Sequence, residues 1–254
     1  MKVFVTDKYR VLTFLLICTV IGMGAIFAGE DSVTVSTASK IVPIYSVGRD
    51  DGKIAVTFDC AWGAEDMESI LSTLKNHNCN ATFFVLGTWA EQNPDIMKKL
   101  VAEGHEIGNH SDNHAHVNKL SYDANLLDMK KCNEKIEKIT GKKVKFYRGP
   151  YGEYNNIVIK TAEELGMKVI QWDMDTLDYM GKTAMEMCLR IEEKIRNGSI
   201  ILMHNDTKYT ASGLQQIIDT IKNLSSLFDF FKLNSEERIK EGERNVEICK
   251  PVVF

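Results

Sequence analysis

The chain has 254 residues, of which 44% are hydrophobic and 26% are charged, a balance typical of a globular protein with one α/β domain and a short extension. The formal net charge of -4 at pH 7 argues against a nucleic-acid partner, because proteins that bind phosphate backbones usually carry a basic stripe. The six scattered cysteines form no C-x-x-C pair, and an odd number of them follows the apolar N-terminal stretch, which argues against a disulfide scaffold.

The N-terminal residues indicate export. Basic residues at positions 2, 8 and 10 precede an uncharged apolar stretch, residues 11–28, that is just long enough to cross a membrane as a helix. We expect a retained signal anchor over residues 1–28, with the rest of the chain on the extracytoplasmic side. A cleaved signal peptide and a secreted protein are the alternative. Residues 29–50, rich in Ser, Thr and Val, are interpreted as a linker.

Strand and helix patterns alternate after the linker. The apolar run at residues 53–58 predicts a strand, and the apolar face formed by Ile70, Leu71 and Leu74 predicts a helix after it. Further strands are expected in NATFFVLG, HEIGNH, KVKFYRG, GMKVIQWDMD and GSIILMHN, and further helices after an N-cap at Asn93, from Tyr122 to Thr140, in EYNNIVIKTAEELG and in AMEMCLRIEEKIRNG. Such alternation predicts parallel strands joined by crossover helices, an α/β fold with a distorted (β/α) barrel of about seven units.

Polar residues stand directly after several of the apolar runs. In barrels of this kind the chemistry collects at the C-terminal ends of the strands, so we expect these side chains to converge. One of them, Asp59, lies beside Phe58 and Trp62, where partial desolvation could raise the pKa of a carboxyl group toward that of a general base. The residues in such positions are Asp59, His110, Arg148, Asp175 and His204.

Two further patterns suggest a metal ion and an anion. His110 and His114 are four residues apart, a spacing used by many zinc sites when the segment turns helically. A surface pair is the alternative interpretation, since His105 and His116 make the whole region rich in histidine. Arg148 begins the segment RGPYG, in which a fixed cation could hold a carboxylate while the turn exposes backbone N–H groups; an ordinary β-turn is the alternative.

Taken together and in this order, the segments TFD, HSxxH, RGPYG, DxxDY and LMH resemble the five motifs of the polysaccharide deacetylase family, the NodB-type domain of carbohydrate esterase family four. The surrounding residues resemble the branch with a TFDxxWG first motif, which includes sporulation and cell-wall deacetylases. The resemblance implies a catalytic domain over residues 51–227. The charged segment 228–254 is expected to be a tail, where the family would normally offer a final strand and helix.

The resemblance also implies roles for the individual residues. Asp59 would be the base that activates a metal-bound water, and His204 would be the acid that protonates the departing amine. His110 and His114 would bind a divalent metal ion, with zinc as the expected ion. Among the other residues, Arg148 would orient Asp59, Asp175 would hold the His204 imidazole, the Tyr151 backbone N–H would help to bind the oxyanion, Leu202 and Trp172 would line the acetyl pocket, and Trp62 would belong to the wider substrate pocket.

The third metal ligand stays open. In the commonest form of the first motif, TFDD, the second Asp is a ligand, whereas this chain has Cys60 at that position. The ligand could be the Cys60 thiolate, which favours a softer ion such as zinc, a nearby carboxylate from Asp66 or Glu65, or water. We favour the carboxylate or water. For Asp66 the alternative is an ordinary negative charge at a helix N-terminus.

The implied function is hydrolysis of N-acetyl groups from N-acetylglucosamine or N-acetylmuramic acid units of peptidoglycan, by a catalytic domain expected to be monomeric. A chitin-like oligosaccharide and acetylated xylan are the alternative substrates. A glycan-binding relative that lost catalysis at Cys60 is an alternative of a different class. The presence together of Asp59, Arg148, Asp175 and His204 argues against that alternative.

Overall fold

The computed structural model describes residues 40–48, 51–224 and 229–231. The expected anchor over residues 1–28 lies outside these ranges, as do most of the expected linker and tail. In the part of the chain that is described, no helix has the length and apolar character needed to span a membrane.

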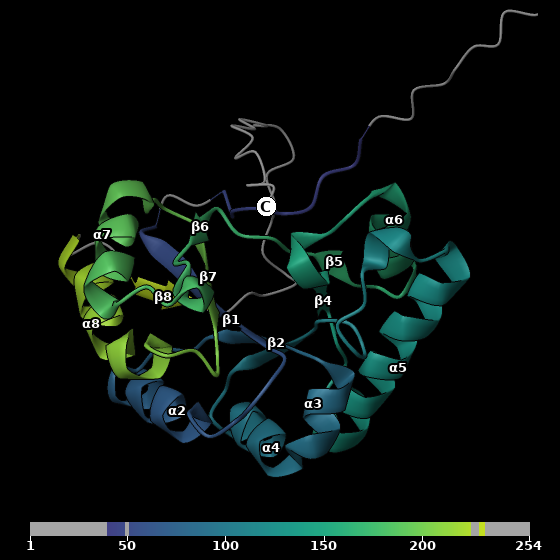
Figure 1. Ribbon diagram of the computed structural model, residues 1–254, viewed down its shortest axis with the longest axis horizontal. Helices are drawn as coiled ribbons and strands as arrows, with labels where there is room; N and C mark the ends of the chain where they lie inside the picture. The colour runs from purple at the N-terminus through teal and green to yellow at the C-terminus, as the bar shows by residue number, and fades with distance from the viewer. Residues whose placement is uncertain (1–39, 49–50, 225–228, 232–254) are drawn as a thin grey trace, which may run out of the picture. The chain divides into compact units, whose positions relative to one another are not determined.

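The core of the structure is one curled sheet of parallel strands (Figure 1). Its strands run in the order β5-β4-β3-β2-β1-β7-β6, and β8 also pairs with β1. The sheet confirms the predicted α/β fold with a distorted barrel. The strands are β1 (Lys53–Cys60), β2 (Thr82–Val85), β3 (Glu106–Asn109), β4 (Phe146–Tyr147), β5 (Lys168–Val169), β6 (Met174–Asp175), β7 (Ile200–His204) and β8 (Asp229–Phe231).

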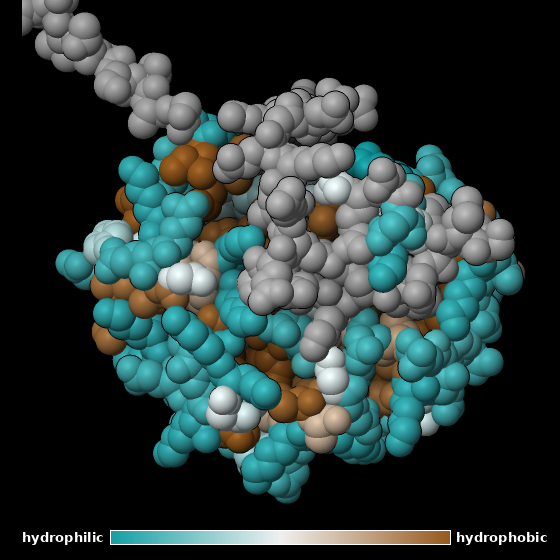
Figure 2. All heavy atoms as spheres, turned by 180° about the vertical axis from the view of Figure 1, so that it is seen from behind, coloured by the Kyte–Doolittle hydropathy of each residue, from teal (hydrophilic) through white to brown (hydrophobic). Residues whose placement is uncertain are grey.

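Helices surround the outside of the curled sheet, from α7 and α8 on one side, past α2, α4 and α3, to α5 and α6 on the other (Figure 1). They are α2 (Met67–Asn76), α3 (Gly87–Gln92), α4 (Pro94–Ala102), α5 (Tyr122–Thr140), α6 (Asn156–Glu164), α7 (Ala184–Lys194) and α8 (Thr210–Leu224), with short 3-10 helices η1 (Val117–Lys119), η2 (Pro150–Gly152) and η3 (Asp178–Met180). Seen from behind, hydrophilic side chains cover most of the described surface, with small apolar areas between them (Figure 2).

The helix boundaries follow local capping signals. Ser121 caps α5 by accepting a hydrogen bond from the Ala124 N–H, and Gly141 ends the same helix in the left-handed conformation. Thr183 and Glu186 form a capping box at the start of α7. The expected cap at Asn93 differs: its side chain donates to the Trp89 carbonyl, which ends the unpredicted helix α3, and makes no capping bond to α4.

Side chains of β1 alternate between two cores. Val56, Phe58 and Cys60 belong to the large apolar cluster, whereas Ala55 belongs to a smaller cluster on the other face of the strand. Because successive side chains of a strand point to opposite faces, Asp59 lies on the same face as Ala55 and on the opposite face from Cys60. This alternation separates the two residues of the first motif.

Three segments differ from the predicted elements. The run GMKVIQWDMD forms two short strands, β5 and β6, at opposite edges of the sheet. Ile44 bridges to Ile170, and Ser46 bridges to Ser199 just before β7, so the end of the expected linker joins the sheet. The expected tail contributes β8, whose residues 229–231 pair with the start of β1. The sheet therefore extends on both sides of the expected boundaries at residues 51 and 227.

Candidate active site

A buried carboxylate and a buried guanidinium meet at the C-terminal end of β1. Arg148 donates from one nitrogen to Asp59 Oδ1 at 2.7 Å and to Thr57 Oγ1 at 2.9 Å, and from another to the Gln171 carbonyl at 3.0 Å. The guanidinium is fully buried and lies 4.1 Å from the centroid of the Phe84 ring. The predicted contact between Arg148 and Asp59 is present, and each charge has a partner, as buried charges require.

The charges around Asp59 decide its ionisation. Burial works to raise the pKa of this carboxyl group, but the interactions with Arg148, His110 and His204 together outweigh it, and the pKa is lowered. The expected rise beside Trp62 is therefore wrong. Trp62 is 63% exposed and does not enclose the carboxyl group, while the guanidinium makes direct contact. Asp59 is a carboxylate at neutral pH.

His110 has a defined tautomer. Its Nδ1 lies 2.8 Å from the Arg148 carbonyl oxygen, which only accepts, so Nδ1 carries the hydrogen and Nε2 keeps a lone pair. That Nε2 lies 3.7 Å from Asp59 Oδ2. Burial lowers the pKa of His110, more than the Asp59 charge raises it. A neutral imidazole thus turns a free lone pair toward the carboxylate.

His114 lies next to His110, with ring centroids 5.4 Å apart. Its Nδ1 is buried and has no hydrogen-bond partner. Burial, and after it the neighbouring His110, lower the pKa of His114 to about 4. The two rings meet through a loop and not through the helical turn assumed from their spacing, since Ser111 and His114 both adopt positive φ, at 79° and 62°.

Buried polar residues hold this histidine loop. Asn109 accepts a hydrogen bond from the Ser111 N–H at 2.7 Å, and Asp128 accepts from the Ser111 hydroxyl and from the Asp112 N–H, both at 3.2 Å. Lys135 pairs with Asp112 at 2.8 Å. The sequence interpretation missed Asn109 and Asp128. Asp128 lies among the many polar residues of helix α5, and its position in the sequence gives no sign that it contacts the loop.

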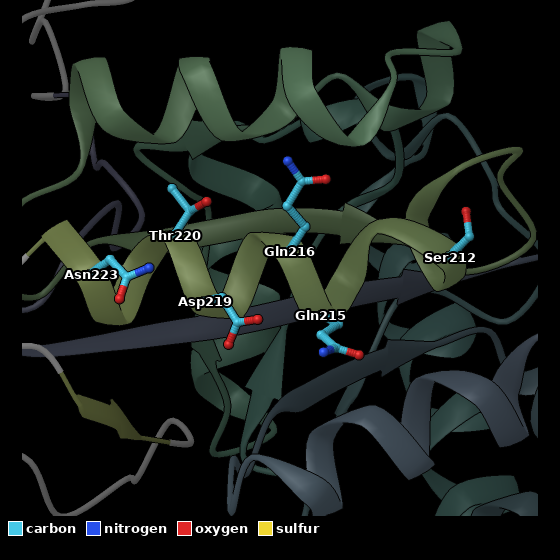
Figure 3. A pocket seen from close by; sticks show the side chains of 6 residues that line it. All are labelled: Ser212, Gln215, Gln216, Asp219, Thr220 and Asn223. Atoms are coloured by element: carbon cyan, nitrogen blue, oxygen red, sulfur yellow. The ribbon is translucent and has the colours of Figure 1, made fainter.

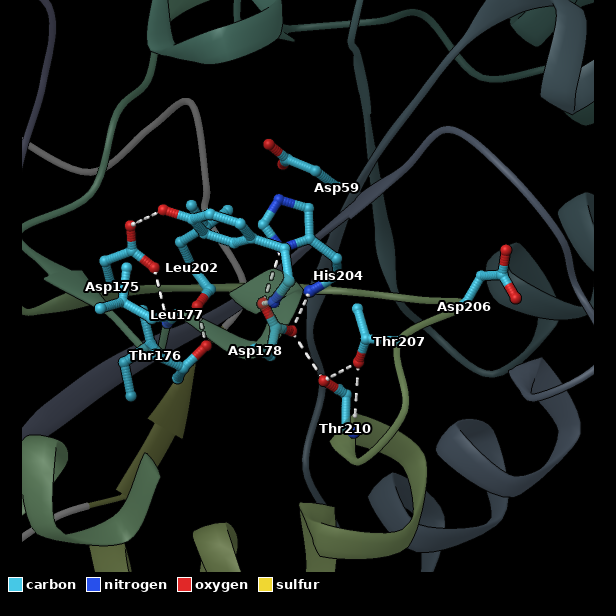
Figure 4. A network of polar contacts seen from close by, with 12 residues as sticks. Asp59, Asp175, Thr176, Leu177, Asp178, Leu202, His204, Asp206, Thr207 and Thr210 are labelled. Atoms are coloured by element: carbon cyan, nitrogen blue, oxygen red, sulfur yellow. Dashed lines mark hydrogen bonds and ion pairs between the residues drawn. The ribbon is translucent and has the colours of Figure 1, made fainter. Parts of the chain in front are cut away.

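His204 stands on the strand next to Asp59. The parallel register of β1 and β7 pairs Asp59 with His204, so both side chains leave the same end of the sheet. The His204 Nδ1 lies 2.8 Å from Asp178 Oδ1, and its backbone N–H donates to Asp178 Oδ2 at 2.6 Å (Figure 4). Burial works to lower the pKa of His204, but the hydrogen bond and charge of Asp178 outweigh it, and the pKa is raised.

The partner of His204 is a correction to the sequence interpretation, which assigned the imidazole to Asp175. Asp175 instead accepts from the Leu177 N–H at 2.8 Å and from the Tyr179 hydroxyl at 3.4 Å (Figure 4). Leu177 has a φ of 58°, and the chain turns there so that the second Asp of the DxxDY motif reaches the imidazole. The DxxDY motif contains two carboxylates three residues apart, so Asp178 could have been named from the sequence as a second candidate partner for His204.

The candidates for the third metal ligand do not gather around the histidines. Cys60 is fully buried in the large apolar cluster, and burial raises the pKa of its thiol. Asp66 Oδ2 accepts from the Asp206 N–H at 2.9 Å, and Glu65 accepts from the Ala64 N–H. Within residues 40–48, 51–224 and 229–231, no group of three or more His, Cys, Asp or Glu side chains is arranged to hold a metal ion.

The expected pocket residues occupy different depths. Leu202 is 2% exposed and lies two residues below His204 on β7, while Trp172 is half-buried, with its ring 5.4 Å from the Arg148 guanidinium. Trp62 and Tyr151 are exposed, and their ring centroids lie 4.9 and 4.5 Å from that of His114. Tyr151 has a φ of 58°. These aromatic rings form an exposed rim beside the histidines.

A separate surface hollow lies on α8. It is lined by polar side chains that project from this helix (Figure 3). The hollow contains none of the predicted site residues. Its lining residues are Ser212, Gln215, Gln216, Asp219, Thr220 and Asn223.

Comparison with known proteins identifies relatives of this arrangement. Residues 46–170 match the family model described as polysaccharide deacetylase. The chain is 38% identical to YlxY, an uncharacterized protein of Bacillus subtilis (strain 168), over 71% of the chain and 56% of YlxY. It is 33% identical to a peptidoglycan-N-acetylglucosamine deacetylase of Bacillus cereus, over 76% of the chain and 72% of that protein.

One similar solved structure belongs to a protein that is described as a pseudoenzyme. The protein BA3943 from Bacillus anthracis, described as a CE4 family pseudoenzyme, superposes with a TM-score of 0.71 at 33% identity, over 75% of this chain and 67% of that one. A BA3943 mutant is described as having restored enzymatic activity. The chain also spans little more than half the length of YlxY.

Proposed function

Because the chain belongs to the polysaccharide deacetylase family, we propose that it hydrolyses N-acetyl groups of peptidoglycan, on N-acetylglucosamine or N-acetylmuramic acid units. Relatives named as deacetylases of each sugar support this substrate class. Chitin-like oligosaccharides and acetylated xylan are the alternative substrates. The observation that carries the proposal is the pairing of Asp59 with His204 on adjacent strands, each with its own buried partner.

The two residues can perform the two proton transfers that hydrolysis of an amide requires. Asp59, kept ionised by Arg148, can accept a proton from the attacking water. His204 donates its Nδ1–H to Asp178 and can carry a second proton on Nε2, which it gives to the departing amine. The raised pKa of His204 favours this protonated form. The acetyl group leaves as acetate, and the sugar keeps a free amine.

The histidine pair suits a divalent metal ion, for which we propose zinc. The His110 Nε2 lone pair and the unpartnered, buried Nδ1 of His114 show that both rings have a nitrogen available as a ligand. When bound, such an ion would lower the pKa of a water ligand and polarise the acetyl carbonyl. Water is the proposed source of further ligands, because in the described part of the chain Asp66 is not grouped with the two histidines, and the apolar surroundings of Cys60 argue against its thiolate.

The test is acetate release by the full chain from peptidoglycan and from N-acetylglucosamine oligomers, with and without a chelator. We expect release that stops with chelator and returns with added zinc. Asp59→Asn should reduce the rate on the order of 100-fold or more, because it removes the proposed general base. Release that is insensitive to chelator, or unchanged in Asp59→Asn, would contradict the proposal.

A non-catalytic, glycan-binding role is the second candidate. The similarity to the BA3943 pseudoenzyme favours it, as does the lack of a third converging ligand in the described part of the chain. In that case the wild-type protein would bind N-acetylglucosamine oligomers without releasing acetate, and added zinc would not change this. Acetate measured alongside binding by calorimetry separates the two candidates.

We also propose that the N-terminal apolar stretch, residues 11–28, holds the protein at the membrane with residues 51–227 on the extracytoplasmic side, where peptidoglycan is found. The sequence pattern of basic residues followed by this stretch supports the proposal. Fractionation of cells that express the full chain tests it. Recovery of the intact protein in the cytosol would contradict it.

A further inference from the structure

The Asp178 carboxylate receives four hydrogen bonds. Oδ1 accepts from the His204 imidazole and from the Tyr179 N–H, both at 2.8 Å. Oδ2 accepts from the His204 backbone N–H at 2.6 Å and from the Thr210 hydroxyl at 2.7 Å (Figure 4). Two of these four donors belong to His204, and the third belongs to Tyr179, which follows Asp178 in the chain. Thr210, the first residue of α8, brings the fourth donor from a separate element.

The Thr210 hydroxyl has a fixed hydrogen direction. An ionised carboxylate can only accept, so the hydroxyl hydrogen points to Asp178. The Thr210 oxygen in turn accepts from the Thr207 hydroxyl at 2.6 Å, and the Thr207 oxygen accepts from the Thr210 N–H at 3.3 Å. Thr210 is fully buried. The chain of donors Thr207 and Thr210 therefore runs in one direction and ends at the Asp178 carboxylate, which also accepts from the His204 imidazole.

This chain of donors constrains a side chain that would otherwise turn easily. The terminal torsion of an Asp side chain has a broad, nearly two-fold energy profile, so packing alone sets the carboxylate plane poorly. A hydrogen bond on each oxygen, one of them from α8, holds the plane in which Oδ1 meets the His204 Nδ1. Loss of the α8 donor would leave Oδ2 with the His204 backbone N–H alone.

We propose that Thr210 is a positioning residue, which acts through Asp178 to hold the His204 imidazole in the orientation and tautomer needed for proton donation. The proposal rests on the proposed function only for its catalytic consequence. Partners that orient metal-bound histidines typically change activity by about 10- to 100-fold when they are removed, and for Thr210 we expect an effect at the lower end of that range.

The alternative is that Thr210 merely anchors the start of α8. Thr176 provides a matched control for this alternative, since it is equally buried and its hydroxyl donates at 2.8 Å to the Leu202 carbonyl on β7. Thr176→Val thus removes a buried hydroxyl of the same kind, next to the same strand, without touching Asp178. A purely structural role predicts similar effects of the two substitutions.

The first measurement is the NMR signal of the His204 Nδ1–H in full-length protein labelled with ¹⁵N-histidine, assigned by its loss in His204→Gln. We expect a signal protected from solvent exchange in the wild type, in Thr210→Ser and in Thr176→Val. In Thr210→Val the signal should broaden or exchange with water. If Thr210→Val does not fold, Thr210→Ala, which also lacks the hydroxyl, is measured in the same way.

The second measurement is the kinetics of acetate release. Thr210→Val should lower kcat on the order of 10-fold with little change in KM, and Thr210→Ser should restore most of it. An unchanged His204 signal in Thr210→Val, or a loss of kcat equal to that in Thr176→Val, would overturn the proposal. A wild-type protein that releases no acetate would refute the proposed function, while the NMR signal would still decide the role of Thr210.

Discussion

At the scale of single residues, the proposed base and the proposed acid lie on adjacent strands, and their partners shift their pKa values in opposite directions. Arg148 lowers the pKa of Asp59 against the effect of burial, and Asp178 raises the pKa of His204 against the same effect. Both partners are buried, so solvent screens neither interaction strongly. The opposite pKa directions of the two groups are those that acid–base catalysis requires.

The Arg148–Asp59 pair should also matter for folding. Arg148→Met leaves a buried carboxylate without its cation, and we expect this change to lower the free energy of unfolding by about 3–5 kcal/mol. Urea denaturation at pH 7 measures the loss. The control is Arg196→Met, since Arg196 is 65% exposed in its pair with Asp173 and should contribute about 1 kcal/mol or less. Equal losses in the two variants would contradict this account.

The two carboxylates of the DxxDY motif should differ in their effect on pH dependence. A raised pKa keeps His204 protonated above its ordinary value of 6.5, so kcat/KM should fall only as pH rises through the higher value. Asp178→Asn removes the hydrogen bond and the charge, which shifts this alkaline fall to lower pH. Asp175→Asn should shift it much less, because Asp175 contacts Leu177 and Tyr179. Equal shifts would favour the original assignment to Asp175.

The same pKa shift affects stability with a definite sign. The stabilisation from the charged His204 is fully present below its ordinary pKa and is lost as pH rises through the folded value. The carboxylate of Asp59 behaves in the opposite way, since its lowered pKa gives stability that is present above 3.8 and is lost as pH falls through the folded value.

At the scale of the elements, the segment before β1 completes the sheet near its open side. The Ile44 N–H donates a hydrogen bond to the Val169 carbonyl at the end of β5. The Val47 N–H donates to the Gly198 carbonyl at 2.8 Å, just before β7 (Figure 1). Gly198 has a φ of 75°, and a Cβ there would lie 1.7 Å from the Val47 carbonyl oxygen. The close approach of these two backbones requires glycine.

Gly198→Ala should therefore destabilise the protein by more than the strain of placing alanine in a left-handed backbone conformation. The control is Gly166→Ala, where φ is 74° but no atom lies within 4 Å of the added Cβ. We expect about 1–2 kcal/mol for Gly166→Ala from backbone strain, and a larger loss for Gly198→Ala from the added clash. Urea denaturation of both variants measures the difference. If Gly198→Ala lowers the free energy of unfolding no more than Gly166→Ala does, the segment around Val47 moves away from the added Cβ without cost, which would contradict this account.

At the scale of the whole molecule, a bound metal ion should stabilise the folded state. An ion present at 100 times its Kd adds about 2.7 kcal/mol to the free energy of unfolding, provided it does not bind the unfolded chain. We expect zinc to raise the urea midpoint of the wild type and of Cys60→Ala, but not of His114→Ala. A zinc effect lost in Cys60→Ala would restore the thiolate as a ligand, against its position in the apolar core.

The alternation of strands and helices and the order of the polar strand ends could be predicted from the amino-acid sequence. Hydrophobic periodicity is a local property, and the parallel sheet then brings the C-terminal ends of β1, β3 and β7 to one edge. Asp59, His110 and His204 could thus be selected from the chain alone, whereas the pairing of Arg148 with Asp59 was implied by the family resemblance and is present in the structure.

The remaining features became visible only in the folded chain, because they depend on how its segments turn and pack against one another. The turn at Leu177 selected Asp178 over Asp175, and strand alternation directed Cys60 into the core and away from Asp59. The pKa direction of Asp59 followed from the net effect of burial and of three neighbouring groups on other elements. Such balances arise only when the chain is folded, since local sequence carries no record of which distant charge will lie nearby.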